Sequence, residues 1–78
     1  MADEQQIIEV IAENLTLPPA DIDMEAHLQD DLGLNPVEIA DLIGSISKKF
    51  NVFFESSEIA QTKTVSDLVE LVEDKLLE

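Results

Sequence analysis

Apolar residues recur at helical spacing in three segments of this 78-residue chain, and that periodicity constrains its fold more than any other feature. The spacing predicts helices over residues 3–15 and 36–50, and a last helix from residue 64 nearly to Glu78. The apolar run at residues 52–54 is long enough for a short strand, but no other segment is suited to pair with it. We therefore expect an all-α fold in which this run is extended and packs Phe54 inward.

The first predicted helix begins near Asp3 and ends at Leu15. Asp3 and Gln6 have the spacing of a capping box. Pro18 and Pro19 follow, and both prolines are incompatible with a helix that continues through them, so we expect them to end it. The apolar face of this helix consists of Ile7, Ile8, Ile11 and Leu15.

A long connection from Leu17 to Asn35 separates the first two predicted helices. Loops of this length are uncommon in a compact domain unless they are functional or held down. The apolar residues expected to hold this loop against the core are Ile22, Leu28 and Leu32.

The second predicted helix has the clearest start in the chain. Asn35 is a favourable N-cap, and Pro36 suits the first helical position because its missing N–H would be unpaired there. Glu38 is placed to accept a hydrogen bond from the Asn35 N–H. Lys48 and Lys49 lie in the last turn, where the helix dipole favours cations. The apolar stripe of the helix comprises Ile39, Leu42, Ile43, Ile46 and Phe50.

Two further helix starts follow. Ser56 or Ser57 is expected to cap one short turn that ends near Ile59. Thr64 begins the last helix, with Asp67 three residues later as its capping partner. The apolar face of that helix consists of Val65, Leu68, Val69, Val72 and Leu76. The chain is thus predicted to be one domain over residues 1–78, a small four-helix bundle with three main helices, one short helix and a long first loop.

The chain is strongly acidic, with a formal charge of −14 from 18 acidic and four basic residues. The excess is concentrated in residues 1–47, which contain no lysine. Such a surface repels nucleic acid and anionic membranes and attracts proteins with basic patches. No apolar run approaches the roughly 18 residues of a membrane span, and the polar N-terminus is unlike a secretory signal. We therefore expect a cytoplasmic monomer whose charge either recruits basic partners or only keeps the domain soluble.

Few residues of this chain are suited to catalysis or metal binding. It has no cysteine, and its one histidine, His27, cannot by itself anchor a zinc site. A calcium loop starting at Asp21 needs Gly at its sixth position and Glu at its twelfth, but Ala26 and Leu32 stand there. The spacing supports no nucleophile–base pair and no Gly-rich phosphate loop. We therefore predict that the protein is not an enzyme and holds no metal.

The order of these features over nearly the whole chain resembles the acyl carrier protein family. The similarity is densest from Asp31 to Phe50, where the family has Asp-Leu-Gly-x-Asp-Ser-Leu-Asp/Glu ahead of a helix that ends in Phe. This chain has Asp-Leu-Gly-Leu-Asn-Pro-Val-Glu over residues 31–38. Residues 64–65 resemble the family's entry to its last helix, and Leu28 resembles its loop-anchoring apolar position.

The resemblance implies a carrier that holds an acyl or aminoacyl chain as a thioester on a phosphopantetheine arm, which is attached to the serine of that motif. Pro36 stands at the serine position and has no hydroxyl, while Asn35 and Val37 replace the family's Asp and Leu. The other serines of the chain lack the Asp-Leu-Gly context. We therefore expect no cofactor on this chain unless an arm is attached elsewhere.

The resemblance also implies a surface for partner proteins, because the family's second helix presents carboxylates to basic patches on its enzymes. The residues expected to bind partners are Asp31, Asn35, Pro36, Val37, Glu38 and Asp41. Lys48 and Lys49 depart from the family's acidic pattern, and they either alter the partner set or only cap the helix. Gly44, inside the same helix, either lets a partner approach closely or is a tolerated small residue.

Two functions stay open at this point. The chain is either a carrier homologue that works through protein contacts alone, in a regulatory or structural role, or a working carrier of fatty acid or polyketide biosynthesis. The second alternative requires an arm attached elsewhere or a different natural residue at position 36. In both cases the expected partners are basic-surfaced proteins, among them the enzymes of those syntheses. A helical bundle with a convergent similarity is the remaining alternative.

Overall fold

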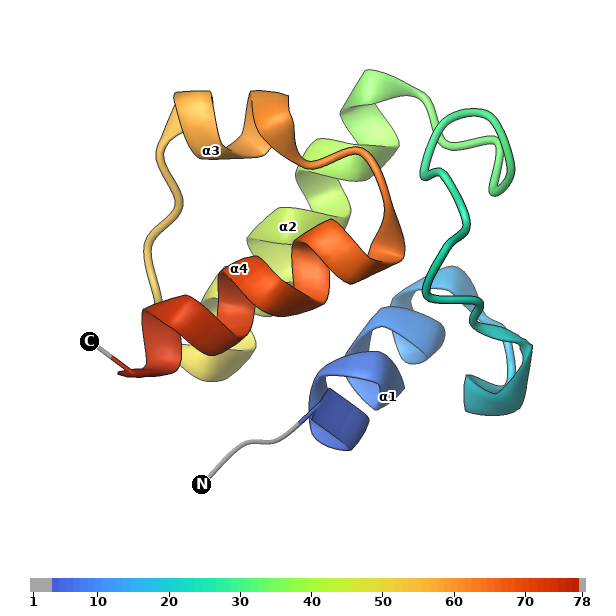
Figure 1. Cartoon of the computed structure of the whole chain (residues 1–78), viewed down its shortest axis with the longest axis horizontal. Coiled ribbons are helices and arrows are strands. Elements are labelled where there is room, and N and C mark those ends of the chain that lie inside the picture. The colour runs from blue at the N-terminus through green and yellow to red at the C-terminus, as the bar shows by residue number, and fades with distance from the viewer. Residues whose placement is uncertain (1–3, 78) are drawn as a thin grey trace.

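The structure is a computed structural model that describes residues 4–77 (Figure 1). These residues form the helices α1 (Glu4–Leu15), α2 (Pro36–Phe50), α3 (Ser56–Gln61) and α4 (Val65–Leu77), with a 3-10 turn, η1 (Pro19–Asp21), in the long first loop. The described part of the chain has no regular strand, and its one isolated bridge pairs His27 with Thr64. The predicted all-α bundle with one short helix is thus confirmed. Asp3, the predicted start of the first helix, lies outside the described residues.

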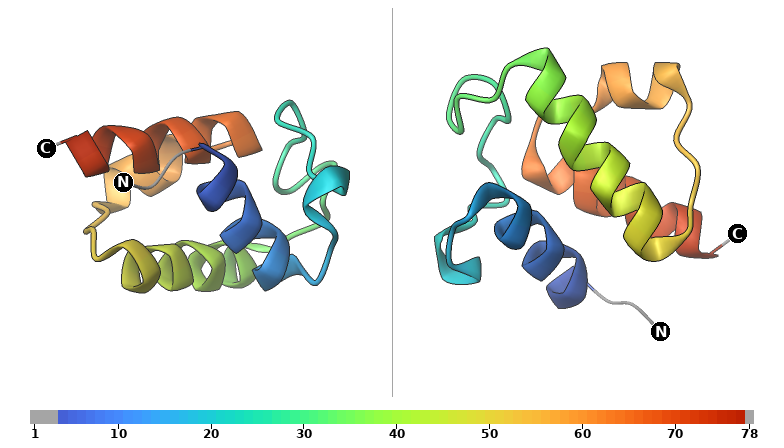
Figure 2. Two further views of the ribbon diagram at one scale, coloured as in Figure 1. Left: turned by 90° about the horizontal axis from the view of Figure 1, so that it is seen from below. Right: turned by 180° about the vertical axis from the view of Figure 1, so that it is seen from behind.

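The three main helices surround one core. In Figure 2, α1 lies between α2 and α4, while α3 spans the side between α2 and α4 in Figure 1. Each main helix turns its predicted apolar face inward, and the long loop and the segment before α3 add to the same cluster. The buried apolar residues of this cluster are Ile7, Ile11, Ala26, Leu28, Leu42, Ile43, Ile46, Phe54, Val65, Leu68, Val69 and Val72. No residue within α3 is buried.

The last turn of α1 closes at Thr16, two residues before Pro18. Thr16 has a left-handed backbone with φ +56°. The Leu17 N–H then donates to the Ala12 carbonyl at 2.9 Å, a bond typical of a Schellman helix end. The predicted boundary at Leu15 is correct. The prolines come after the helix has ended, and Pro19 opens η1.

The long first loop is packed against the core, as predicted from its length. Leu28 is buried, and Ile22 and Leu32 are half-buried against the core. Ala26, which the sequence reasoning did not include, is buried as well. Three main-chain hydrogen bonds join the loop to the start of α4: Leu28 N–H to the Lys63 carbonyl at 2.9 Å, Val65 N–H to the Ala26 carbonyl at 3.0 Å and Ser66 N–H to the Met24 carbonyl at 2.8 Å.

The segment between α2 and α3 is extended and packs Phe54 into the core, as predicted, while Phe53 is 75% exposed. The start of α3 differs from the prediction. Its N-cap is Glu55, whose N–H donates to the Glu58 carboxylate at 2.8 Å, so neither Ser56 nor Ser57 is the cap. The helix also runs past Ile59 to Gln61. Glu55 and Glu58 thus cap the start of α3, where the sequence predicted a serine cap.

The last helix begins as predicted. The Asp67 N–H donates to the Thr64 hydroxyl oxygen at 3.1 Å, and the Thr64 N–H donates to the Asp67 carboxylate at 3.2 Å. Among the described residues, no helix combines the length and the apolar character that crossing a membrane requires.

Candidate functional site

The start of α2 is closed by a complete capping box. Asn35 is extended, with φ −84° and ψ 169°, and its side-chain oxygen accepts the Glu38 N–H at 2.8 Å. The Glu38 carboxylate accepts the Asn35 N–H at 2.9 Å. Pro36 occupies the first helical position. Because Pro36 has no N–H, the capping box pairs most of the donors that a helix start would otherwise leave open.

The approach to this helix is a tight turn. The Asp31 carboxylate accepts the His27 N–H at 2.7 Å, which closes the loop upon itself. Gly33 follows with φ +69°, a conformation that side chains disfavour. The Leu34 N–H then donates to the Leu28 carbonyl at 3.0 Å. This turn thus connects buried Leu28 to the exposed start of α2.

The six residues predicted to bind partners are all at the surface. All of them, namely Asp31, Asn35, Pro36, Val37, Glu38 and Asp41, are exposed. Asp31 and Glu38 each use a carboxylate oxygen within the chain, so they fix the site's shape as well as its charge. Val37 is 68% exposed and adds an apolar side chain next to the carboxylates of this helix start. Their role in binding stays a prediction.

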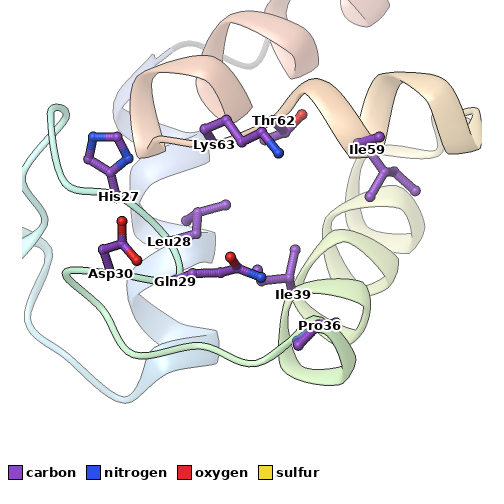
Figure 3. Close-up of a pocket in the computed structure, with 10 residues that line it drawn as sticks. His27, Leu28, Gln29, Asp30, Pro36, Ile39, Ile59, Thr62 and Lys63 are labelled. Carbon is purple, nitrogen blue, oxygen red and sulfur yellow. The ribbon is translucent and has the colours of Figure 1, made fainter.

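A cavity of about 410 Å³ adjoins the start of α2 (Figure 3). Side chains from the long loop, α2, α3 and the segment before α4 meet around it: His27, Leu28, Gln29, Asp30, Pro36, Ile39, Ile59, Ala60, Thr62 and Lys63. Leu28, Ile39 and Ile59 supply its apolar walls, while His27, Asp30 and Lys63 bring polar groups. The sequence reasoning missed this cavity. The available signal was Ile39, which continues the apolar stripe of α2 but is only half-buried.

A smaller depression of about 180 Å³ lies against another face of the same helix start. Glu38 and Asp41 line it together with Asn14, Leu15, Leu34 and Leu42. The two predicted partner carboxylates on α2 therefore border a recess between α1 and α2. Recesses thus border the first turns of α2 on two faces.

The residue at the start of α2 does not fit a phosphopantetheine arm. Attachment of such an arm needs a hydroxyl, and Pro36 has none. Serines elsewhere have other settings: the Ser47 hydroxyl donates to the Val52 carbonyl, and the Ser66 hydroxyl donates to the Glu70 carboxylate at 3.1 Å. Ser56 and Ser57 open α3 and are exposed, and neither follows an Asp-Leu-Gly sequence. None of these serines stands at the start of α2.

Perturbed acids lie at the starts of the later helices. The Glu55 N–H and then the Lys75 ammonium hold the pKa of Glu58 below its usual value. Hydrogen bonds from the Lys63 N–H and then from Thr64 hold the pKa of Asp67 below its usual value. Both shifts come from capping and pairing, so they indicate structure rather than acid–base catalysis. Within the described residues, no three acids or histidines gather in a way that would hold a metal ion.

Comparison with known proteins agrees with this architecture. The family model for the phosphopantetheine attachment site matches residues 5–72. An acyl carrier protein of Amoebophilus asiaticus is 31% identical over 95% of this chain and 92% of its own. One from Coprothermobacter proteolyticus is 31% identical over 92% of this chain and 88% of its own. This chain belongs to the acyl carrier protein family.

The fold agrees with that membership. The crystal structure of an acyl carrier protein from Thermotoga maritima superposes with a TM-score of 0.76, covering 92% of this chain and 84% of that one at 25% identity. The family resemblance read from residues 31–50 is thereby confirmed, and a convergent bundle is excluded. The prediction that the chain is not an enzyme is confirmed too, because acyl carrier proteins are carriers rather than catalysts.

Proposed function

We propose that this member of the acyl carrier protein family has lost the attachment site for phosphopantetheine and acts through protein contacts, in a regulatory or structural role. The observation that carries the proposal is Pro36 at the first position of α2. The motif resemblance assigns the attachment serine to that position. A proline there removes the nucleophilic hydroxyl and also starts the helix well, so the substitution is compatible with a stable fold.

The surface around Pro36 supports a role in contacts. Exposed Val37 offers an apolar centre, and Glu38 and Asp41 offer negative charge beside it. An apolar residue surrounded by charges of one sign favours a partner with complementary basic groups. We propose enzymes of fatty acid or polyketide synthesis as partners, since carriers of this family serve those syntheses. A cytoplasmic location and a monomeric state remain predictions.

A working carrier is the second candidate function. The match over residues 5–72 favours it, because nearly the whole carrier domain is retained. It requires an arm on another residue or a different natural residue at position 36. In that case phosphopantetheine would supply the thiol that holds the acyl chain, and the start of α2 would serve only as the docking surface.

The intact mass of the protein purified from its own source tests the proposal. The same measurement is made after incubation with a broad-specificity phosphopantetheinyl transferase and coenzyme A. We expect an unmodified mass in both samples. A gain equal to one phosphopantetheine arm overturns the proposal, and peptide mapping of that product identifies the attachment residue.

The contact surface is tested separately by competition. This protein is titrated into a reaction of a basic-surfaced synthase enzyme with its own acyl carrier, and inhibition is measured. We expect inhibition that weakens several-fold when Val37→Ala and Asp41→Lys are combined, because the apolar contact and the charge are both lost. The matched control Glu13→Lys, on α1, changes the net charge by the same amount and should leave the inhibition unaltered. Equal weakening by the control contradicts a surface centred on α2.

A further inference from the structure

The two ends of α2 carry opposite charge. The first turns hold Glu38 and Asp41, whereas the last turn holds Lys48 and Lys49, two of the chain's four lysines. Both of these lysines are exposed. Because α2 has 15 residues, its two ends lie about 22 Å apart. The basic end is therefore a surface distinct from the one around Pro36.

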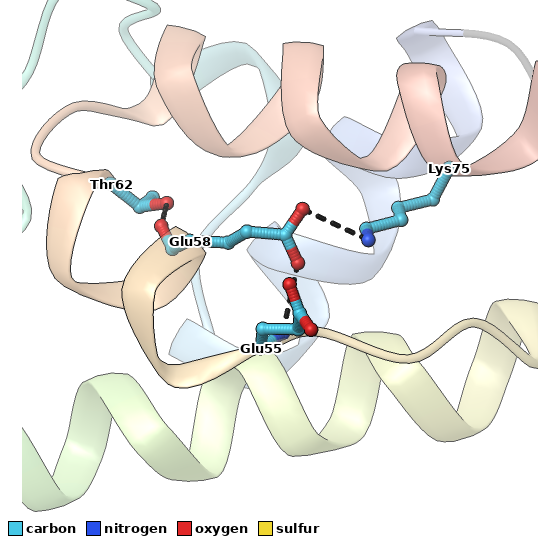
Figure 4. A network of polar contacts seen from close by, with 4 residues as sticks. All are labelled: Glu55, Glu58, Thr62 and Lys75. Carbon is cyan, nitrogen blue, oxygen red and sulfur yellow. Dashed lines mark hydrogen bonds and ion pairs between the residues drawn. The ribbon is translucent and has the colours of Figure 1, made fainter.

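Lys48 and Lys49 differ from the lysine of α4 in having no partner. Lys75 Nζ lies 2.9 Å from Glu58 Oε2, so its charge joins α4 to α3 (Figure 4). Within the described part of the chain, neither Lys48 nor Lys49 has a side-chain partner. Two adjacent unpaired cations thus give this end of α2 a positive surface, in a chain whose formal charge is −14.

Ser47 fixes the segment that follows the two lysines. Its carbonyl accepts the Asn51 N–H and, at 3.1 Å, the Val52 N–H, and its hydroxyl donates to the Val52 carbonyl. Asn51 has a left-handed backbone with φ +56°, so the chain turns back directly after α2. Phe54 is then buried, and the alternation of an extended backbone turns its neighbour Phe53 outward, where it is 75% exposed. The aromatic ring is therefore held beside the last turn of α2.

A recess of about 410 Å³ adjoins Phe53. Its lining comes from the segment after α2 and from the last turns of α4: Asn51, Val52, Phe53, Glu55 and Lys75. Leu77, two residues after Lys75, is 81% exposed. Phe53 and Leu77 are the two most exposed large apolar side chains of the described residues, and both belong to segments at the same end of the molecule (Figures 1 and 2). This end thus combines apolar surface, a recess and positive charge.

We propose that Lys48, Lys49 and Phe53 form a docking surface for an acidic segment of a partner protein. An apolar side chain of that segment packs on Phe53, and its carboxylates pair with the two lysines. Charge complementarity favours this occupant, because unpaired cations beside an exposed aromatic ring match carboxylates beside an apolar residue.

The net charge of the chain disfavours the other occupants. A second copy of this chain also carries −14, so the two copies repel each other. Nucleic acid and anionic membranes are repelled for the same reason. The docking surface is separate from the start of α2, so it depends neither on the absence of an arm nor on the binding of a partner at Val37.

Two variants remove the parts of this surface separately. Lys48→Gln/Lys49→Gln removes both charges and keeps side chains that favour a helix. Phe53→Ser removes the ring, and the exposure of Phe53 means that little packing is lost. Circular dichroism and urea denaturation verify that both variants fold like wild type.

Two control variants make matched changes away from this surface. Gln29→Glu/Gln61→Glu lowers the net charge by the same amount as the lysine double variant, at exposed positions in the long loop and at the end of α3. Val37→Ser removes an exposed apolar side chain at the opposite end of α2. Both controls should leave the docking surface intact.

An acidic peptide probes the surface by nuclear magnetic resonance. In this peptide a leucine–phenylalanine pair has two glutamates on each side, and it is titrated into the isotope-labelled full chain. We expect amide shifts centred on Lys48, Lys49, Asn51 and Phe53. The affinity should fall about three- to ten-fold in the lysine double variant and about ten-fold in Phe53→Ser, while both controls bind like wild type. Replacing the glutamates of the peptide with glutamines should weaken binding as much as the lysine double variant does.

The result that overturns the docking surface is equally specific. It is an absence of shifts at the end of α2 with millimolar peptide, a set of shifts centred on the start of α2, or equal affinity in wild type and the lysine double variant.

Photo-cross-linking in the source cells identifies the natural occupant. Phe53 is replaced with p-benzoylphenylalanine, which keeps an aromatic ring at that position, and the cross-linked peptide is sequenced by mass spectrometry. We expect a segment of another protein that contains carboxylates beside an apolar residue. The adduct should be lost with Lys48→Gln/Lys49→Gln and retained with Gln29→Glu/Gln61→Glu. An adduct with a second copy of this chain, with a basic segment or with a lipid, an adduct that persists without the lysines, or no adduct at all contradicts an acidic protein partner.

Discussion

The helices α2 and α3 begin with related devices and differ in how firmly they are held. At both starts a glutamate three residues into the motif accepts the N–H of the cap residue, at 2.9 Å in α2 and 2.8 Å in α3. However, α2 buries Leu42, Ile43 and Ile46, whereas α3 buries nothing. A cap therefore determines where a helix begins, while burial determines how much of the fold's stability depends on that helix.

Truncating the core face of α2 should produce the largest effect. Ile46 is completely buried, so Ile46→Ala should lower the free energy of unfolding by about 2–5 kcal/mol. Ile59→Ala in α3 should cost no more than about half of that, because Ile59 is only half-buried. Urea denaturation followed by circular dichroism measures both. Similar losses in the two variants would contradict the difference between the helices.

Removing the cap of α2 comes next in size. Asn35→Ala should lower the free energy of unfolding by about 0.5–2 kcal/mol, because the Glu38 N–H loses its acceptor. Ser56→Ala is the matched change at the start of α3, and it should stay within about 0.5 kcal/mol of wild type because Glu55 is the cap there. The same denaturation experiment decides. A large loss of unfolding free energy in Ser56→Ala would indicate that Ser56, and not Glu55, caps α3.

Adding a methyl group inside α2 should strengthen it. A Cβ at Gly44 meets no atom within 4 Å, so Gly44→Ala should raise the free energy of unfolding by about 0.5–1 kcal/mol. Gly33→Ala is the control, and it should destabilise by about 1 kcal/mol because φ is +69° there. Unfolding of both variants is compared with wild type. If Gly44→Ala is stable but loses inhibition in the competition assay, Gly44 admits a partner.

The smallest expected effect depends on pH. The pKa of Asp67 is lowered in the folded state, chiefly by the Lys63 N–H. Its contribution to stability is therefore present above the unfolded-state pKa of about 3.9 and is lost as the pH falls through the lower folded-state value. The difference in unfolding free energy between wild type and Asp67→Asn should be largest near neutral pH and shrink in acid. A difference that grows in acid would contradict a lowered pKa of Asp67 in the folded state.

The start of α2 was predictable because its chemistry is local. The residue types and spacing of Asn35, Pro36 and Glu38 are enough to predict a helix start. The structure forms both hydrogen bonds of the capping box. The Thr64–Asp67 start of α4 follows the same logic. Apolar periodicity likewise predicted which faces of the main helices are buried.

The remaining features depend on tertiary context. Serine has a higher N-cap preference than glutamate, so the assignment of Ser56 or Ser57 followed local propensity, whereas Glu58 bonds to Glu55 and to Lys75 on α4. Thr16 is β-branched and rarely takes a left-handed backbone, so no local pattern predicts its role as the end of α1. The cavity needs side chains from four segments, which no single segment of sequence reveals.

One paired mass measurement tests most directly whether Pro36 has removed the attachment site. Wild type and the variant Asn35→Asp/Pro36→Ser/Val37→Leu are incubated side by side with a broad-specificity phosphopantetheinyl transferase and coenzyme A. We predict that the variant gains the mass of one phosphopantetheine arm while wild type gains none, because the variant restores the hydroxyl at position 36 together with the two motif residues beside it. An arm on wild type would contradict the account, since attachment would then not require a serine at the start of α2.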